Sequence, residues 1–109
     1  MLPNIPGMGN LQKQVQKMQE DMVRLQDELA AERLETTAGG GMVKVTTTGA
    51  GEILEVKISP EAVDPNDVEM LEDLVVTAVR DAIRRAQDNQ TQKMNAIAGP
   101  LAGKMPGLF

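Results

Sequence analysis

The sequence contains no cysteine and no histidine. These absences exclude disulfide scaffolds, thiol nucleophiles, zinc fingers and histidine-based acid–base catalysis. Tryptophan and tyrosine are also absent, and Phe109 is the single aromatic residue, so an aromatic platform for stacking single-stranded bases is not expected. The core must therefore be built from aliphatic side chains and from the eight methionines, which pack adaptably.

Long apolar runs are missing as well. No segment approaches the roughly 20 apolar residues that a membrane-spanning helix requires, and no signal-peptide pattern opens the chain. We therefore expect a cytoplasmic protein without a membrane partner. The 109 residues suffice for one domain. Their net charge of −5 argues against a diffuse polycation but leaves room for a local basic patch.

Residues 10–33 have the pattern of a long helix that begins at an N-cap, Asn10. Neither glycine nor proline interrupts this segment, and its apolar residues recur at intervals of four and three, as in the seam of a coiled coil. This seam consists of Leu11, Val15, Met18, Met22, Leu25 and Leu29.

The periodicity then changes to that of strands. Residues 42–48 alternate and are rich in β-branched side chains, the turn signal of residues 49–51 follows, and residues 53–58 alternate again. Two adjacent strands joined by a short glycine connection predict an antiparallel hairpin. Residues 34–38, on the other side of the triple glycine at 39–41, are expected to add a third strand.

A second helix is expected from residue 65 into the 90s, with Asp64 as its N-cap and Pro65 at its first position. Its apolar residues cover about half of the helix circumference, which is more than a surface helix usually needs. The excess indicates contacts on two sides of the helix.

The two ends of the chain are rich in proline and glycine. Residues 1–9 and 99–109 are expected to be flexible tails around a single domain at 10–98. Both tails are rather apolar, so docking onto a partner is the alternative.

A dimer is the expected assembly. A seven-residue strand spans about 23 Å, whereas the first helix would be about 36 Å long, so three strands cannot cover both helices. We expect a homodimer that buries the seam of the first helix together with Val79 and Ile83 of the second. The alternative is that the two helices fold back on each other within one chain.

Charge is segregated in the second half of the chain. Residues 61–79 carry six acids and no base, whereas residues 80–109 carry five bases and two acids. The dipole of the second helix explains this order without any ligand, because acids favour its start and bases its end. Contact between the basic half and an anion such as DNA is the alternative.

On the first helix, Lys13, Lys17 and Arg24 share a stripe opposite the apolar seam. This stripe either tracks phosphates or is the solvated face of a coiled coil, on which Glu20 would pair with Arg24.

No catalytic group of residues emerges. The acids of residues 61–79 have no histidine, cysteine or tyrosine to work with, and residues 39–41 lack the lysine and hydroxyl of a phosphate-binding loop. We expect no enzymatic activity, no cofactor, no metal site and no small-molecule substrate.

Four segments together resemble the YbaB/EbfC family of bacterial nucleoid-associated proteins, and they occur in the family's order over nearly the whole chain. They are GMGNLQKQVQKMQEDMVRLQDELA, GGGMVKVTTTGAGEILEVKISPEAV, DVEMLEDLVVTAVRDAIRRA and the terminal MPGLF. The resemblance implies an α+β fold, in which homodimers form from α-β-β-β-α protomers with a long N-terminal helix, a small antiparallel sheet and a long C-terminal helix.

The resemblance also implies function. It implies binding to double-stranded DNA with weak sequence preference, a place at the nucleoid, and effects on nucleoid organisation and gene expression, with recombination or repair proteins as further partners. Because DNA contacts in the family are attributed to the projecting helices, the candidate DNA-binding residues are Lys13, Lys17, Arg24, Arg84, Arg85 and Lys93.

A protein-interaction adaptor is the rival hypothesis. It would use the seam of the first helix and the methionine-rich ends as docking surfaces. It accounts more easily for the net charge of −5.

Overall fold

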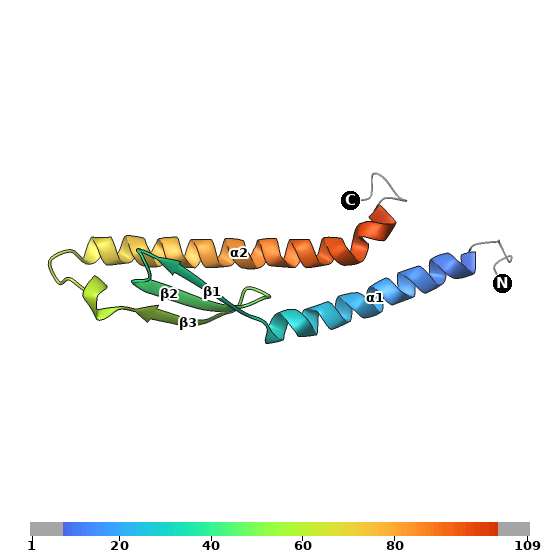
Figure 1. Cartoon of the computed structure of the whole chain (residues 1–109), viewed down its shortest axis with the longest axis horizontal. Helices are drawn as coiled ribbons and strands as arrows, with labels where there is room; N and C mark the ends of the chain where they lie inside the picture. The colour runs from blue at the N-terminus through green and yellow to red at the C-terminus, as the bar shows by residue number, and fades with distance from the viewer. Residues whose placement is uncertain (1–7, 103–109) are drawn as a thin grey trace.

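The computed structural model describes residues 8–102 and has the order α-β-β-β-α that the family resemblance implies. A long helix α1 (Met8–Ala31) leads into three strands, β1 (Arg33–Ala38), β2 (Val43–Thr48) and β3 (Ile53–Ile58). A short 3-10 helix η1 (Pro60–Ala62) precedes the long helix α2 (Val68–Ala102). Figure 1 shows the small sheet beside the first half of α2, with α1 extending away from the sheet toward the other end of the molecule.

The three strands form one antiparallel sheet in the order β1-β2-β3, which confirms the predicted hairpin and the predicted third strand. Val45 of the central strand lies opposite Thr36 on one side and Val56 on the other. A bulge at Thr46/Thr47 shifts the register between β2 and β3.

Glycines make both connections of the sheet possible. Gly39, Gly40 and Gly41 all have positive φ, and so does Gly51 in the turn between β2 and β3. Residues with a Cβ adopt this region only at a cost. At Gly39 there is a second reason, because a Cβ there would lie 2.8 Å from Cδ2 of Leu74 on α2.

The helix starts differ from the predicted ones. Helix α1 begins at Met8, so Asn10 lies inside it and is not its N-cap. Helix α2 begins at Val68, and its cap is Asp67, whose Oδ1 accepts the backbone N–H of Met70 at 3.2 Å. The predicted cap, Asp64, instead accepts the N–H of Asn66 in the preceding turn. Both residues have the right chemistry, and the turn geometry decides which of them faces the helix.

The helix ends differ as well. Helix α1 ends at Ala31, two residues before the predicted end, and α2 continues through Gly99 and Pro100 to Ala102. Four residues assigned from the sequence to the C-terminal tail are therefore helical. The predicted tail residues 1–7 and 103–109 lie outside the described part of the chain.

The core lies between α2 and the sheet, where α2 packs on β1 and β2. Val43 and Val45 of β2 are fully buried against Ala78 and Ala82 of α2. Alanines at the contact let the helix approach the strands closely, so the core packs densely without aromatic side chains. Strand β3 is left exposed along its whole length.

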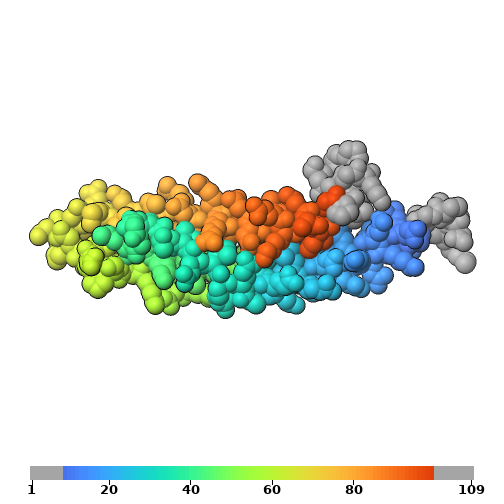
Figure 2. Space-filling model, in the orientation of Figure 1, coloured from blue at the N-terminus to red at the C-terminus, as the bar shows by residue number. Residues whose placement is uncertain are grey.

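The two long helices run antiparallel and contact each other in Figures 1 and 2, where α1 lies along the second half of α2. Leu25 and Leu29 of the predicted seam are buried in this chain, at 5% and 6% exposure. The helices thus fold back on each other within one protomer, which was the alternative to a seam buried wholly between protomers. The first turns of the seam stay open, because Leu11 and Val15 are each 38% exposed.

Candidate nucleic-acid interface

The six candidate cations are distributed along both helices rather than gathered in one patch. Lys13, Lys17 and Arg24 are exposed on α1, and Arg84 and Arg85 are exposed on α2. Lys93 is half-buried where α2 passes the end of α1.

On α1, Lys13 and Lys17 make none of the ion pairs found in residues 8–102. Arg24 pairs with Asp21 at 3.4 Å, not with Glu20 as expected from the sequence. This pair is highly exposed on the arginine side, so water screens it and a competing anion can displace it.

On α2, Arg84 belongs to a second feature that the sequence analysis did not single out. Arg80, Arg84 and Gln87 line a groove of about 560 Å³ together with valines and Ile83. Arg80 and Arg84 are one turn apart and so share a face of the helix. The i, i+4 spacing of the two arginines is the sequence signal that could have added Arg80 to the candidates.

Arg85 points to the other flank of α2, where its guanidinium donates a hydrogen bond to the backbone carbonyl of Glu35 in β1. This contact ties α2 to the sheet. Arg85 therefore combines an exposed charge with a structural role, and the structure does not bring it together with Arg84 despite their adjacency in sequence.

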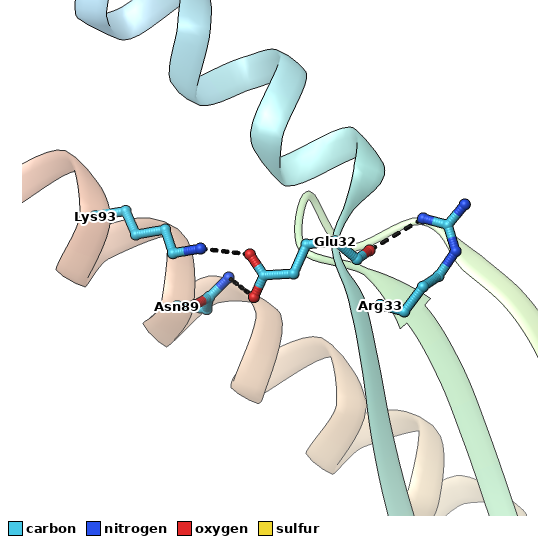
Figure 3. A network of polar contacts seen from close by, with 4 residues as sticks. All are labelled: Glu32, Arg33, Asn89 and Lys93. Atoms are coloured by element: carbon cyan, nitrogen blue, oxygen red, sulfur yellow. Dashed lines mark hydrogen bonds and ion pairs between the residues drawn. The ribbon is translucent and has the colours of Figure 1, made fainter.

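Lys93 already has a partner within the chain. Its Nζ lies 2.5 Å from Oε2 of Glu32, the residue between α1 and β1, and the amide of Asn89 donates to the other carboxylate oxygen at 3.2 Å (Figure 3). The hydrogen bond from Lys93, helped by the one from Asn89, holds the pKa of Glu32 below its ordinary value, although desolvation acts in the opposite direction.

The helix-dipole explanation of the basic residues does not fit the observed length of α2. The dipole acts within the last turn of a helix, and α2 carries no base in its last turn. Arg80, Arg84 and Lys93 stand in the middle of the helix, so their placement needs another reason.

Within residues 8–102 there is no group of three or more acidic side chains placed to hold a metal ion. None of the helices in this part of the chain is long and apolar enough to cross a membrane.

The fold and the arrangement of charges define an elongated α+β protein whose long helices present separated cations to solvent. Comparison with known proteins gives the family: the chain belongs to the YbaB/EbfC DNA-binding family, whose model matches residues 4–101. The expectation from the sequence is thereby confirmed.

Curated relatives support the same family assignment. A nucleoid-associated protein of Pelotomaculum thermopropionicum is 53% identical over 102 residues, which cover 94% of this chain and 95% of the relative. A nucleoid-associated protein of Acetivibrio thermocellus is 51% identical over 108 residues, with 95% of each chain covered.

The fold is also similar to a crystal structure of an uncharacterized protein from Helicobacter pylori. The TM-score is 0.62 at 22% identity, over 72% of this chain and 90% of the other. At this identity, the likeness concerns the fold alone.

Proposed function

We propose that this protein is a non-enzymatic, nucleoid-associated homodimer that binds double-stranded DNA through phosphate contacts from lysines and arginines on α1 and α2. The observation that carries the proposal is the set of exposed cations on the helices of a chain from a DNA-binding family. Lys13, Lys17, Arg80 and Arg84 form none of the ion pairs present in residues 8–102, so they are ready to meet phosphate.

Little base readout is expected. Contacts to phosphates position a protein on the duplex without reading its sequence, and the exposed cations of the helices are proposed to make contacts of this kind. Affinity should therefore depend on ionic strength, with a slope of about −0.9 in log–log form for each phosphate neutralised.

A fluorescence anisotropy titration with duplexes of unrelated sequence, in a salt series, tests the proposal. Binding is expected at low salt, with similar affinity for each duplex and a clear salt slope. Absence of binding at low salt, or affinity that does not change with salt, would overturn it.

Arg80→Gln combined with Arg84→Gln localises the contact. The double variant is expected to weaken binding about tenfold or more and to flatten the salt slope by about 0.9 for each arginine that contacts a phosphate. Lys44→Gln combined with Lys57→Gln is the matched control, because it changes the net charge equally at lysines that pair with Glu35 and Glu55 on the sheet. Equal effects of the two double variants would show that only net charge matters.

The proposed dimer is supported by two uncovered apolar surfaces, one on β3 and one on α2. The strand register puts Val56 and Ile58 of β3 on the side of the sheet that faces α2, yet they remain 40% and 41% exposed because α2 covers β1 and β2. At 100° per residue, Val79 and Ile83 lie on the flank of α2 shared with Gln90, beside the β2–β3 turn. A second copy would cover both surfaces.

The predicted interface on α1 divides in two. Leu25 and Leu29 are buried within the protomer, and Met18 and Met22 are half-buried, whereas Leu11 and Val15 are exposed. We propose that the outer end of α1 contributes to the dimer and that the inner end stabilises the protomer.

The names of the relatives support a location at the nucleoid in the cytoplasm. A role in nucleoid organisation and gene expression stays a prediction of the family resemblance, and so does a link to recombination or repair proteins.

The adaptor hypothesis is favoured by the apolar side chains exposed on α1, including Val23 at 62%. A pull-down from lysate with and without nuclease separates the two functions. Partners lost on nuclease treatment support DNA binding, and partners that persist support an adaptor.

A further inference from the structure

The ion pair of Glu32 and Lys93 joins residues that are 61 positions apart in sequence. It lies where α1 ends and β1 begins, against the middle of α2 (Figure 3). Lys93 is one of the candidate DNA-binding residues, but its ammonium group already faces a carboxylate at 2.5 Å.

Glu32 is held firmly in this position. Its carbonyl accepts the N–H of Gly49 at 3.2 Å, and its own N–H is bonded to the carbonyl of Glu28 at 3.0 Å. A Cβ on Gly49 would lie 3.0 Å from Oε2 of Glu32, so the turn after β2 closes on the carboxylate. Asn89 fixes the remaining oxygen. The carboxylate is thus a preorganised acceptor rather than a freely moving surface group.

The pair is nevertheless accessible to an anion. The side chains of Lys93 and Glu32 are 39% and 25% exposed. A phosphate oxygen and the Glu32 carboxylate present the same chemistry to the lysine, and a lysine that is bonded to one of them at close range is neutralised toward the other. The positive charge of Arg85 also acts on Glu32, so this one carboxylate offsets part of the field of two candidate cations.

We propose that Glu32 withholds Lys93 from DNA phosphate and so limits the affinity of the protein for the duplex. The proposal rests on the DNA binding proposed above. In the bound wild-type protein Lys93 remains on Glu32, and the phosphate contacts come from the cations that have no internal partner. Glu32 is then a positioning residue that acts through Lys93.

The test is duplex affinity and its salt slope for Glu32→Gln, measured by anisotropy on the full chain. Neutral glutamine keeps an oxygen for Asn89 but releases the charge of Lys93. Binding is expected to become roughly three- to tenfold tighter at 0.1 M salt, with a slope steeper by about 0.9 for each Lys93 that gains a phosphate.

Glu72→Gln is the matched control. Glu72 is an exposed carboxylate on the same helix as Lys93 and takes part in none of the ion pairs of residues 8–102. Its substitution changes the net charge by the same amount. An equal gain for both variants would overturn the proposal, because net charge alone would explain it.

Lys93→Gln gives a second test, and its measurement in the wild-type background does not depend on the folding of the Glu32 variant. In the wild-type background it is expected to change affinity less than twofold and to leave the salt slope unchanged. In the Glu32→Gln background it is expected to cancel the whole gain. A slope that falls by about 0.9 in the wild-type background would overturn the proposal, since Lys93 would then already contact phosphate.

The outcomes separate the two proposals. If the wild-type protein does not bind the duplex at low salt, the proposed function fails and this inference fails with it. If the wild-type protein binds and Glu32→Gln binds equally or more weakly while remaining folded by circular dichroism, only the inference fails. The ion pair would then serve only to hold α1 on α2.

Discussion

Glu32 lies at the junction of α1, β1 and α2, and the ionisation of its carboxyl group contributes to the stability of the folded chain. Its pKa is held below the ordinary value of 4.5, first by the hydrogen bond from Lys93 and then by that from Asn89. Because the pKa is lower in the folded chain than in the unfolded one, ionised Glu32 contributes stability above about pH 4.5. This contribution disappears as the pH falls through the folded pKa.

The corresponding prediction concerns the free energy of unfolding of wild type and Glu32→Gln. The wild-type advantage is expected to be constant near neutral pH and to shrink as the pH is lowered below about 4.5. Urea denaturation followed by circular dichroism at several pH values measures it, since the chain has no tryptophan. Glu72→Gln gives the background for loss of an exposed carboxylate. An advantage that does not change with pH would contradict the prediction.

Gly39 allows a second prediction at this scale. Gly39 and Gly40 have φ of +65° and +68°, but a Cβ would meet Leu74 only at Gly39. Gly40→Ala should cost about 1 kcal/mol for the backbone conformation alone. Gly39→Ala should cost up to about 1 kcal/mol more, because the partly buried Leu74 must move. Thermal denaturation compares the two variants, and equal costs would show that Leu74 yields freely.

The candidate DNA-binding residues show which properties of a single residue can be predicted from the sequence. Lys13 and Lys17 were predicted from their stripe on the helix, and the structure leaves both exposed. Lys93 looked like a free cation because its partner lies 61 residues away, and no local periodicity connects the two. The role of Glu32 was missed for the same reason.

At the scale of elements, the N-terminus of α2 provides a prediction. Asp67→Ala removes the side-chain acceptor for the N–H of Met70 and is expected to destabilise the protein by about 1 kcal/mol. Asp67→Asn keeps an acceptor oxygen and should destabilise the protein by only a few tenths of about 1 kcal/mol. Urea denaturation distinguishes them. If both variants lose the same stability, the charge near the helix start matters and the hydrogen bond does not.

The apolar seam of α1 provides another prediction at the scale of elements. Leu29 is 6% exposed and Val15 is 38% exposed, so the two ends of the seam should respond differently to truncation. Leu29→Ala is expected to cost about 2–4 kcal/mol, and Val15→Ala less than about 1 kcal/mol at protein concentrations below those of assembly. A large cost for Val15→Ala that grows with protein concentration would place that end of the seam between protomers.

Strands and helices were largely predictable, whereas their ends were not. β-Branched alternation and the glycine turns located all three strands, because a period of two leaves little ambiguity. The start of α2 was placed three residues early, at Pro65 rather than Val68, because Asp64 and Asp67 are chemically equivalent as caps. Pro100 suggested a tail, yet the backbone of α2 continues past it.

At the scale of the whole molecule, shape is the property that the sequence left open. The chain has a radius of gyration of 20.9 Å and extents of 75 × 26 × 21 Å, against about 13 Å expected for a compact domain of this length. An apolar seam predicts that a partner covers it, but the pattern is the same whether that partner is α2 of the same chain or a second copy. In the structure, Leu25 and Leu29 of the seam are buried within the chain, and Leu11 and Val15 remain exposed.

The elongated shape also separates the charges. The acids that precede and begin α2 lie at the sheet end of the molecule, and the exposed lysines of α1 lie toward the opposite end (Figure 1). With a net charge of −5, a compact chain would surround its cations with acids at short range. The length of the molecule keeps most of these acids beyond about one Debye length from the lysines of α1 at physiological salt.

The assembly itself yields the last prediction. Sedimentation equilibrium at micromolar concentration is expected to give a mass of about 23 kDa, twice the 11.7 kDa of one chain. Ile83→Glu places a charge on the uncovered flank of α2, where Ile83 is 40% exposed in the protomer, and should yield a folded monomer because an unpaired charge is costly in an apolar interface. Val23→Glu, at a residue 62% exposed on α1, should remain dimeric. A wild-type species of one-chain mass would refute the dimer, and dissociation by both variants would place the interface elsewhere.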